Sequence, residues 1–146
     1  MILNPDFREF IALLNKNNVR YLVVGGYAVA FHGHPRYTKD LDLWIWMNKK
    51  NAESLLKTLE EFGFGSVDLS VEDFLNPDNI IQLGYPPNRI DLMTAPKGVE
   101  FDACYQSKIT IEIEGTKINL IDLENLKKNK KATGRNQDLA DLEHLT

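Results

Sequence analysis

Two aspartates interrupt a stretch whose composition is otherwise that of a buried strand. Asp40 precedes the segment LDLWIWM, residues 41–47, and Asp42 lies within it. Because successive side chains of a strand point to opposite faces, Asp40 and Asp42 share one face, while Leu41 and Leu43 point to the other, toward the core. Carboxylates are costly to bury unless they are paired or bind a metal. The pair therefore predicts a site for a hard divalent cation, Mg²⁺ with Mn²⁺ as an alternative.

A third aspartate has the same kind of setting further along the chain. Asp91 is flanked by Ile90 and Leu92 in the segment NRIDLMT, residues 88–94. Three such carboxylates are enough for a two-metal site that catalyses phosphoryl transfer. A D-x-D pair by itself is more often a solvated strand face. The metal-site interpretation therefore depends on this third aspartate and on two glycines that precede the pair.

Those glycines, Gly25 and Gly26, follow the apolar run VRYLVV, residues 19–24, and precede the small-residue segment YAVAFHG, residues 27–33. A strand that turns directly into a helix leaves free backbone N–H groups at the helix start, and glycine lets a phosphate approach them closely. Glycines at such a place also serve simply to turn the chain. The segment is neither a P-loop motif nor the dinucleotide motif G-x-G-x-x-G.

These residues need a scaffold of strands and helices to bring them together. Apolar periodicity predicts helices at 4–18, 27–33, 51–65 and 71–76, and two more within 122–145 that separate at Thr133 and Gly134. Strands are predicted at 19–24 and 41–47, around a turn in 79–94, and as a hairpin in 107–121. Strands alternate with helices and hairpins also occur. This pattern favours an α+β fold, a mixed sheet flanked by helices.

The composition is that of a single soluble domain spanning residues 1–146. The chain is 43% hydrophobic and 26% charged, with a formal net charge of −4, which argues against a large nucleic-acid footprint. No apolar run approaches the roughly 20 residues of a membrane helix. Cys104 is the only cysteine and the N-terminus lacks a signal-peptide pattern. We therefore expect a cytoplasmic protein with no membrane partner.

The combination of motifs resembles the DNA polymerase beta-like nucleotidyltransferase superfamily. Its pattern is a glycine followed by Gly or Ser, a spacer, D-x-D and a later carboxylate. The sequence has GG at 25–26, DLDL at 40–43 and the in-strand aspartate at 91. Within the superfamily it is similar to the small AbiEii-type and minimal nucleotidyltransferases, whose closing pattern of a lysine, an arginine and D-h-x-D matches residues 124–145.

The resemblance implies a reaction and a role for each matched residue. A nucleoside triphosphate and two Mg²⁺ ions bind, a hydroxyl attacks the α-phosphorus, and pyrophosphate leaves. Asp40 and Asp42 would bind metal, and Asp91 would complete the catalytic metal site and help to activate the hydroxyl. Gly25 and Gly26 would hold triphosphate oxygens through backbone N–H groups. Many members carry serine in place of Gly26, so here only the backbone can make that contact.

Other side chains near the D-x-D pair have two interpretations each. Arg36 and Thr38 match the Arg-x-Thr-x-Asp-h-Asp stretch of the small group. Arg36 is a candidate phosphate contact, and an ordinary ion pair with one of the acids is the alternative. Trp44 and Trp46 share the alternation of the aspartates. They could stack on a nucleobase, but strand packing is the favoured interpretation.

The C-terminal stretch adds two candidates for nucleotide binding. Lys130 and Arg135 are assigned to the triphosphate, although a solvated helix face explains the lysines of this stretch equally well. Asp138 and Asp141 stand one helical turn apart. They either orient Arg135 or a lysine, or lie on the helix surface.

Three functions remain open. The first is a metal-dependent nucleotidyltransferase whose acceptor is a tRNA, a protein hydroxyl or a small molecule such as an aminoglycoside. The second is a non-catalytic module of the same fold that binds a partner protein or a nucleotide, for example in a toxin–antitoxin pair. The third is a phosphatase or nuclease with the same metal cluster, against which the Gly-Gly element argues. The intact set of three aspartates favours the first.

Overall fold

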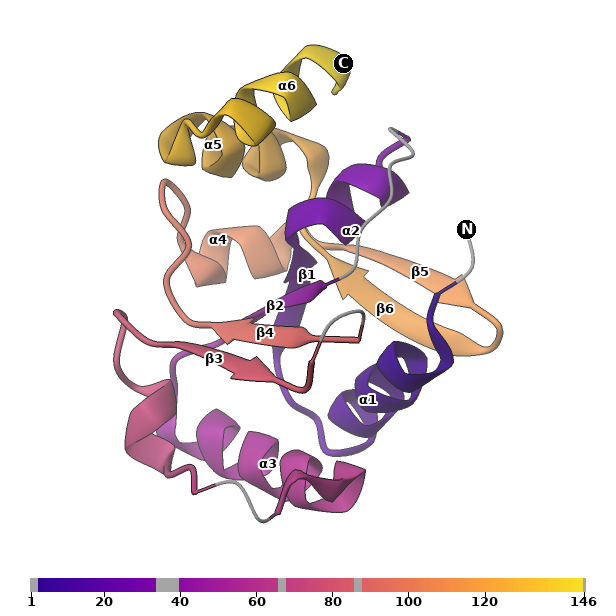
Figure 1. Ribbon diagram of the computed structural model, residues 1–146, viewed down its shortest axis with the longest axis vertical. Coiled ribbons are helices and arrows are strands. Elements are labelled where there is room, and N and C mark those ends of the chain that lie inside the picture. Colours follow the sequence, from indigo (N-terminus) through magenta and orange to yellow (C-terminus); the bar gives the residue numbers. More distant parts are fainter. Residues whose placement is uncertain (1–2, 34–39, 66–67, 86–87, 146) are drawn as a thin grey trace.

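The computed structural model describes residues 3–33, 40–65, 68–85 and 88–145 (Figure 1). The helices are α1 Pro5–Lys16, α2 Gly25–Phe31, α3 Lys49–Leu59, α4 Phe101–Gln106, α5 Leu123–Thr133 and α6 Asn136–His144, with short helical turns η1 Glu60–Phe64 and η2 Val71–Phe74. The strands are β1 Tyr21–Val24, β2 Leu41–Ile45, β3 Ile80–Leu83, β4 Ile90–Met93, β5 Ile109–Ile113 and β6 Thr116–Leu120. Within the described ranges no helix is long and apolar enough to cross a membrane.

The strands form one mixed sheet in the order β3-β4-β2-β1-β6-β5. The central strand β1 is antiparallel to β2 and parallel to β6, and β2 is parallel to β4. The edge strands β3 and β5 pair antiparallel with β4 and β6. Because parallel neighbours need a crossover, the chain passes through α3 and β3 between β2 and β4. The arrangement confirms the predicted α+β fold with a mixed sheet and flanking helices.

Side-chain alternation gives the sheet two apolar faces. One face contributes Val23 and Leu43 to a core that also contains the apolar sides of α1 and α3. The other face contributes Leu22 and Trp44 to a second core, with Cys104 of α4 and part of α5. In Figure 1, α3 lies at one end of the molecule, and α5 and α6 lie at the opposite end, beyond α2. The C-terminal helices therefore stand near the carboxyl end of β1, while α3 lies toward its amino-terminal end.

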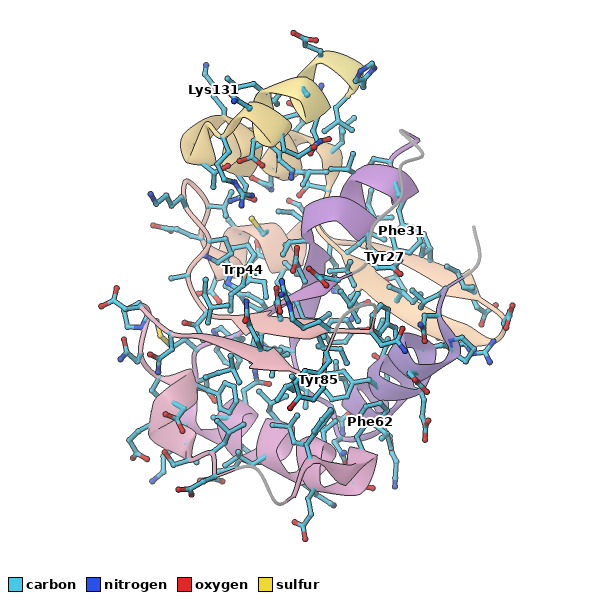
Figure 2. The ribbon with its side chains drawn as sticks, viewed as in Figure 1. Tyr27, Phe31, Trp44, Phe62, Tyr85 and Lys131 are labelled. Carbon is cyan, nitrogen blue, oxygen red and sulfur yellow. The ribbon has the colours of Figure 1, made fainter. Side chains whose placement is uncertain are left out.

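Trp44 shows that the face shared with the aspartates is packed for part of its length. Its side chain is 1% exposed, lies beside α4 (Figure 2), and meets the ring of Phe101 edge-on at a centroid distance of 5.3 Å. The indole Nε1 donates to the carbonyl of Thr94 at 3.1 Å. The favoured interpretation of Trp44 as a packing residue is therefore confirmed.

The sequence prediction missed α4. This helix has six residues, of which Cys104 is the buried one. A single buried position gives no 3.6-residue periodicity to detect. The predicted helix over 51–65 also differs in its bounds. With Asn48 as its N-cap, α3 begins at Lys49, two residues earlier than predicted, and the regular helix ends at Leu59.

The amide of Asn51 fastens the start of β1 to the end of β2. Its side chain is 6% exposed, accepts from the N–H of Arg20 at 2.8 Å, and donates to the carbonyls of Arg20 at 3.1 Å and Trp46 at 2.9 Å. These peptide groups flank the pair Tyr21–Ile45 in the β1–β2 register. Asn51 therefore helps to fix the register that positions Asp42 further along β2.

Replacing Asn51 with alanine removes all three hydrogen bonds and leaves peptide groups without that partner. We expect Asn51→Ala to lower the free energy of unfolding by about 2 kcal/mol, measured by urea denaturation. Lys50→Ala, on the exposed side of the same helix, is the control and should change it by less than about 0.5 kcal/mol. Similar values for the two variants would show that the amide does not fix the strand pair.

Candidate active site

Parallel pairing of β2 with β4 places two of the predicted aspartates side by side. Asp42 lies opposite Asp91 in that register, and on the other side it lies opposite Val24, the last residue of β1. Asp40 directly precedes β2, two positions before Asp42. It therefore lies on the same side of the chain as Asp42. The three carboxylates gather where β1 ends and β2 and β4 begin.

An arginine that the sequence interpretation left out lies among these carboxylates. The guanidinium of Arg89 donates from Nε to Asp91 Oδ1 at 2.9 Å. Its Nη2 donates to Asp40 Oδ2 at 2.8 Å and to Asp91 Oδ2 at 3.2 Å. The hydrogen bonds to Asp91 are the main reason that the pKa of Arg89 is raised. A sequence signal existed, because Arg89 stands two positions before an in-strand aspartate and so shares its face.

Burial and the neighbouring carboxylates both disfavour the ionised form of Asp42. Burial, followed by repulsion from Asp91 and Asp40, raises the pKa of Asp42 to about 7, while Lys130 acts in the opposite direction. Asp91 is only 8% exposed, so water screens this repulsion weakly. A cation close to Asp42 would stabilise its ionised form.

Gly25 is required by its closeness to Asp42. Its φ is +67°, in the left-handed region, and a Cβ built on it would lie 2.1 Å from Asp42 Oδ2. The absence of a side chain thus lets the carboxylate lie against the turn from β1 into α2. Gly26 follows as the second residue of α2 and is buried. Their predicted contacts with phosphate stay a prediction.

A second group of charges, on α5 and α6, faces the aspartates. Lys130 is 3% exposed, and its Nζ lies 3.1 Å from Asp138 Oδ1 and 3.1 Å from Asp141 Oδ2. Arg135 Nε donates to Asp138 Oδ2 at 2.7 Å, although the arginine side chain itself is 74% exposed. Asp138 and Asp141 are 1% and 0% exposed. The helix-surface interpretation of these two aspartates is therefore wrong, and the alternative, that they hold a lysine and Arg135, is confirmed.

The Asp138 carboxylate is the centre of this group. Besides Lys130 and the Arg135 side chain it accepts from Thr133 Oγ1 at 2.6 Å and from the Arg135 N–H at 3.2 Å. Burial alone would raise its pKa, but the hydrogen bonds from Arg135, Thr133 and Lys130 hold the pKa well below the ordinary carboxyl value. The carboxylate therefore stays ionised and fixes the two cations where α5 turns into α6.

Two adjoining clefts are lined both by the aspartates of β2 and by the cations of the α5–α6 region. The smaller, of about 250 Å³, is lined by Gly25, Gly26, Asp40, Asp42, Lys130, Arg135 and Gln137. The larger, of about 410 Å³, shares Gly25, Asp42, Lys130 and Arg135 and extends past β3 and β4 to Lys97 and Asn129. A bigger hollow of about 750 Å³ surrounds Arg20 and Lys117 at the other end of β1 and lacks the aspartates. Six predicted site residues thus line one cleft, while Arg36 and Thr38 lie outside the described residues.

The three carboxylates are of the right chemical type to bind a divalent cation, but their side chains are not arranged around a common point. Among the described residues, no three His, Cys, Asp or Glu side chains stand so that they could hold a metal ion. Asp40 and Asp91 turn oxygens toward Arg89 instead. Carboxylate oxygens are nonetheless the donors that Mg²⁺ and Mn²⁺ prefer. Burial, followed by repulsion from Asp91 and Asp40, raises the pKa of Asp42, and a cation beside it would stabilise its ionised form. Metal binding stays a prediction.

The sheet, the glycine turn and the gathered aspartates define a nucleotidyltransferase fold. A family model described as aminoglycoside-2''-adenylyltransferase matches residues 6–145. The chain therefore belongs to the aminoglycoside-2''-adenylyltransferase family, within the superfamily that the motifs predicted. The AbiEii-type subgroup stays a prediction. No curated protein matches the sequence.

Three solved structures share the fold at low identity. TM1012 of Thermotoga maritima, a candidate nucleotidyltransferase, aligns over 98% of this chain and 94% of its own at 19% identity, with a TM-score of 0.63. The lincosamide antibiotic adenylyltransferase LnuA, solved with lincomycin, aligns over 99% and 96% at 13% identity and a TM-score of 0.60. An antigenic nucleotidyltransferase-like protein of Paracoccidioides brasiliensis aligns over 98% and 77% at 19% identity and a TM-score of 0.58. At these identities the likeness shows the fold alone.

A methyl group at position 25 would occupy the place of an Asp42 oxygen. We expect Gly25→Ala to lower the free energy of unfolding by about 3 kcal/mol, the sum of backbone strain and the clash with the carboxylate. Gly134→Ala is the control, because its φ of +64° is similar and its Cβ would meet only the Lys131 carbonyl at 3.8 Å. That control should cost about 1 kcal/mol. If urea denaturation shows the same loss of unfolding free energy for both variants, the contact with Asp42 does not require glycine at position 25.

Asp138→Asn keeps the shape of the side chain and removes its charge. We expect a loss of about 3 kcal/mol at pH 7, because Lys130 and Arg135 lose a buried anionic partner. Since the folded pKa of Asp138 lies below its unfolded value, its contribution is complete above about pH 4 and is lost as the pH falls further. The difference in melting temperature from wild type should therefore shrink below about pH 4. Glu143→Gln, exposed on the same helix, should show little difference at any pH, and a pH-independent deficit in Asp138→Asn would contradict this account.

Proposed function

We propose that the protein is a metal-dependent nucleotidyltransferase that moves an NMP from an NTP to a hydroxyl acceptor and releases pyrophosphate. The observation that carries the proposal is the cleft in which Asp40, Asp42 and the Gly25–Gly26 turn face Lys130 and Arg135. Carboxylate oxygens that could bind a cation and basic groups that could bind phosphate line the same cleft of about 250 Å³. Family membership supports nucleotidyl transfer as the reaction class.

In this proposal the acidic residues bind the metal and the basic residues bind the phosphate groups. Mg²⁺ or Mn²⁺, when bound to Asp40, Asp42 and Asp91, would neutralise and align the triphosphate. Lys130, held in place by two buried aspartates, directs a fixed positive charge toward the cleft. Such pre-arranged charge stabilises a developing negative charge without reorganisation. Asp91 would accept a hydrogen bond from the attacking hydroxyl and orient it.

The two adjoining clefts suit a reaction with two substrates. The smaller holds the glycines and the phosphate-binding candidates, so we assign it to the triphosphate. The larger shares Asp42 and continues along β3 and β4, so we assign it to the acceptor. The family description and LnuA both name adenylyltransferases of small molecules. We therefore place a small hydroxyl compound first as the acceptor, ahead of a tRNA or a protein hydroxyl.

The decisive test measures nucleotide binding before any acceptor is known. Each NTP is titrated calorimetrically into wild type, Asp42→Asn and Asp102→Asn with Mg²⁺ or Mn²⁺ and with EDTA. Asp102 is exposed on α4 and serves as the matched carboxylate control. We expect metal-dependent binding in wild type and the control. Asp42→Asn should lose that binding.

Catalysis is then measured as pyrophosphate release in the presence of aminoglycosides and other small hydroxyl compounds, tRNA and protein. Asp42→Asn and Asp91→Asn should each lower the rate at least about 100-fold. Release of orthophosphate would identify a phosphatase or nuclease instead. If no nucleotide binds, or if binding is indifferent to the Asp42 change, the protein is better explained as a partner-binding module such as one half of a toxin–antitoxin pair.

A further inference from the structure

Arg89 occupies carboxylate oxygens that a bound metal would need. Its guanidinium takes up one oxygen of Asp40 and both oxygens of Asp91, through contacts of 2.8 to 3.2 Å. Two of the three predicted metal ligands are therefore already engaged by a cation. The three aspartates, although gathered, are not arranged for a metal while Arg89 holds two of them.

The strand register makes this placement specific. Leu41 pairs with Ile90 and Asp42 with Asp91 in the parallel β2–β4 ladder, and the N–H of Leu41 donates to the Arg89 carbonyl at 3.0 Å. Asp40 and Arg89 each stand one residue ahead of this register, at the same end of the two strands. Arg89 and Asp91 are two positions apart, so both side chains project from one face toward Asp40. Moving the arginine by one position would turn it to the opposite face.

The other cations of the cleft are held elsewhere. Lys130 lies between Asp138 and Asp141, and Arg135 binds Asp138. Neither is held by the metal-site carboxylates through these contacts, whereas Arg89 bonds to Asp40 and Asp91 directly. The Arg89 side chain is 28% exposed. It has a route toward solvent and needs no buried cavity to leave its present position.

We propose that Arg89 is a built-in counter-ion that holds Asp40 and Asp91 while the site contains no metal, and that it releases them when a divalent cation binds. The inference rests on the proposed function, because it assumes that these carboxylates are metal ligands. The guanidinium occupies lone pairs of these oxygens and repels a second cation at the same place, so Arg89 and a metal would compete for Asp40 and Asp91. The freed guanidinium would find a replacement anion in the triphosphate. Metal and nucleotide then strengthen each other's binding through Arg89.

The test measures Mn²⁺ affinity, by electron paramagnetic resonance or calorimetry, in the complete protein without nucleotide. We expect Arg89→Gln to bind Mn²⁺ at least about fivefold more tightly than wild type, since the competing cation is gone. Arg89→Lys keeps the charge but loses the forked geometry, and should lie between the two. Lys97→Gln removes one positive charge from the neighbouring larger cleft and controls for the general change in potential, so its affinity should stay within about twofold of wild type.

The same titrations repeated with an NTP present test the coupling. In wild type the nucleotide should tighten Mn²⁺ binding more than it does in Arg89→Gln, because only wild type has an arginine to transfer. In thermal denaturation without metal, Arg89→Gln should melt below wild type, and saturating Mn²⁺ should narrow the difference. Damage to the fold by the substitution would weaken metal binding, which is the opposite sign.

The outcomes separate this inference from the proposed function. Equal or weaker Mn²⁺ binding by Arg89→Gln, with wild type binding the metal, overturns the counter-ion role and leaves the nucleotidyltransferase proposal intact. An affinity gain in Lys97→Gln as large as that in Arg89→Gln also overturns it, in favour of a general effect of charge. Absence of Mn²⁺ binding in every variant, with or without NTP, contradicts the metal site itself, and the counter-ion role fails with it.

Discussion

Parallel pairing of β2 with β4 puts the carboxylate of Asp42 beside that of Asp91, with Asp40 close by, in surroundings that screen charge poorly. The surrounding contacts can be understood as responses to that concentration of negative charge. Arg89 offsets part of it directly, and Gly25 leaves room for an Asp42 oxygen where any other residue would place a side chain. Burial, followed by repulsion from Asp91 and Asp40, still raises the pKa of Asp42 to about 7. A cation beside Asp42 would therefore stabilise its ionised form.

In the second group of charges, on α5 and α6, buried carboxylates surround the cations. Lys130 is paired with Asp138 and Asp141, and Arg135 with Asp138. Hydrogen bonds from Arg135, Thr133 and Lys130 hold the pKa of Asp138 well below the ordinary carboxyl value. Lys130, Asp138 and Asp141 of this group are almost fully buried, whereas the side chains of Arg89 and Asp40 are 28% and 30% exposed. The cleft is therefore bordered on one side by buried ion pairs and on the other by partly exposed ones.

Much of this could be predicted from sequence because the signals are local. Alternation identified the common face of Asp40 and Asp42 and the core role of Leu41 and Leu43, and the structure agrees. The isolated placement of Asp91 in an apolar strand identified it as a third site candidate. Arg89 carries a weaker signal, because it stands just outside the apolar segment that Asp91 interrupts, although it shares a face with Asp91. Asp138 and Asp141 were ambiguous because helical spacing alone does not say which face of a C-terminal helix is covered.

The sequence by itself determined which residue types stand at which periodic positions, and hence the strands, most helices and the acidic and glycine motifs. These follow from side-chain direction and backbone preference within a few residues. Only the tertiary structure decided that β2 and β4 are parallel neighbours in the register that sets Asp42 against Asp91, and that α5 and α6 bury Lys130 between two aspartates. Strand register and helix docking depend on contacts between segments far apart in the chain, where no local pattern specifies the partner. The pairing of Arg89 with Asp40, 49 positions away, belongs to that second class.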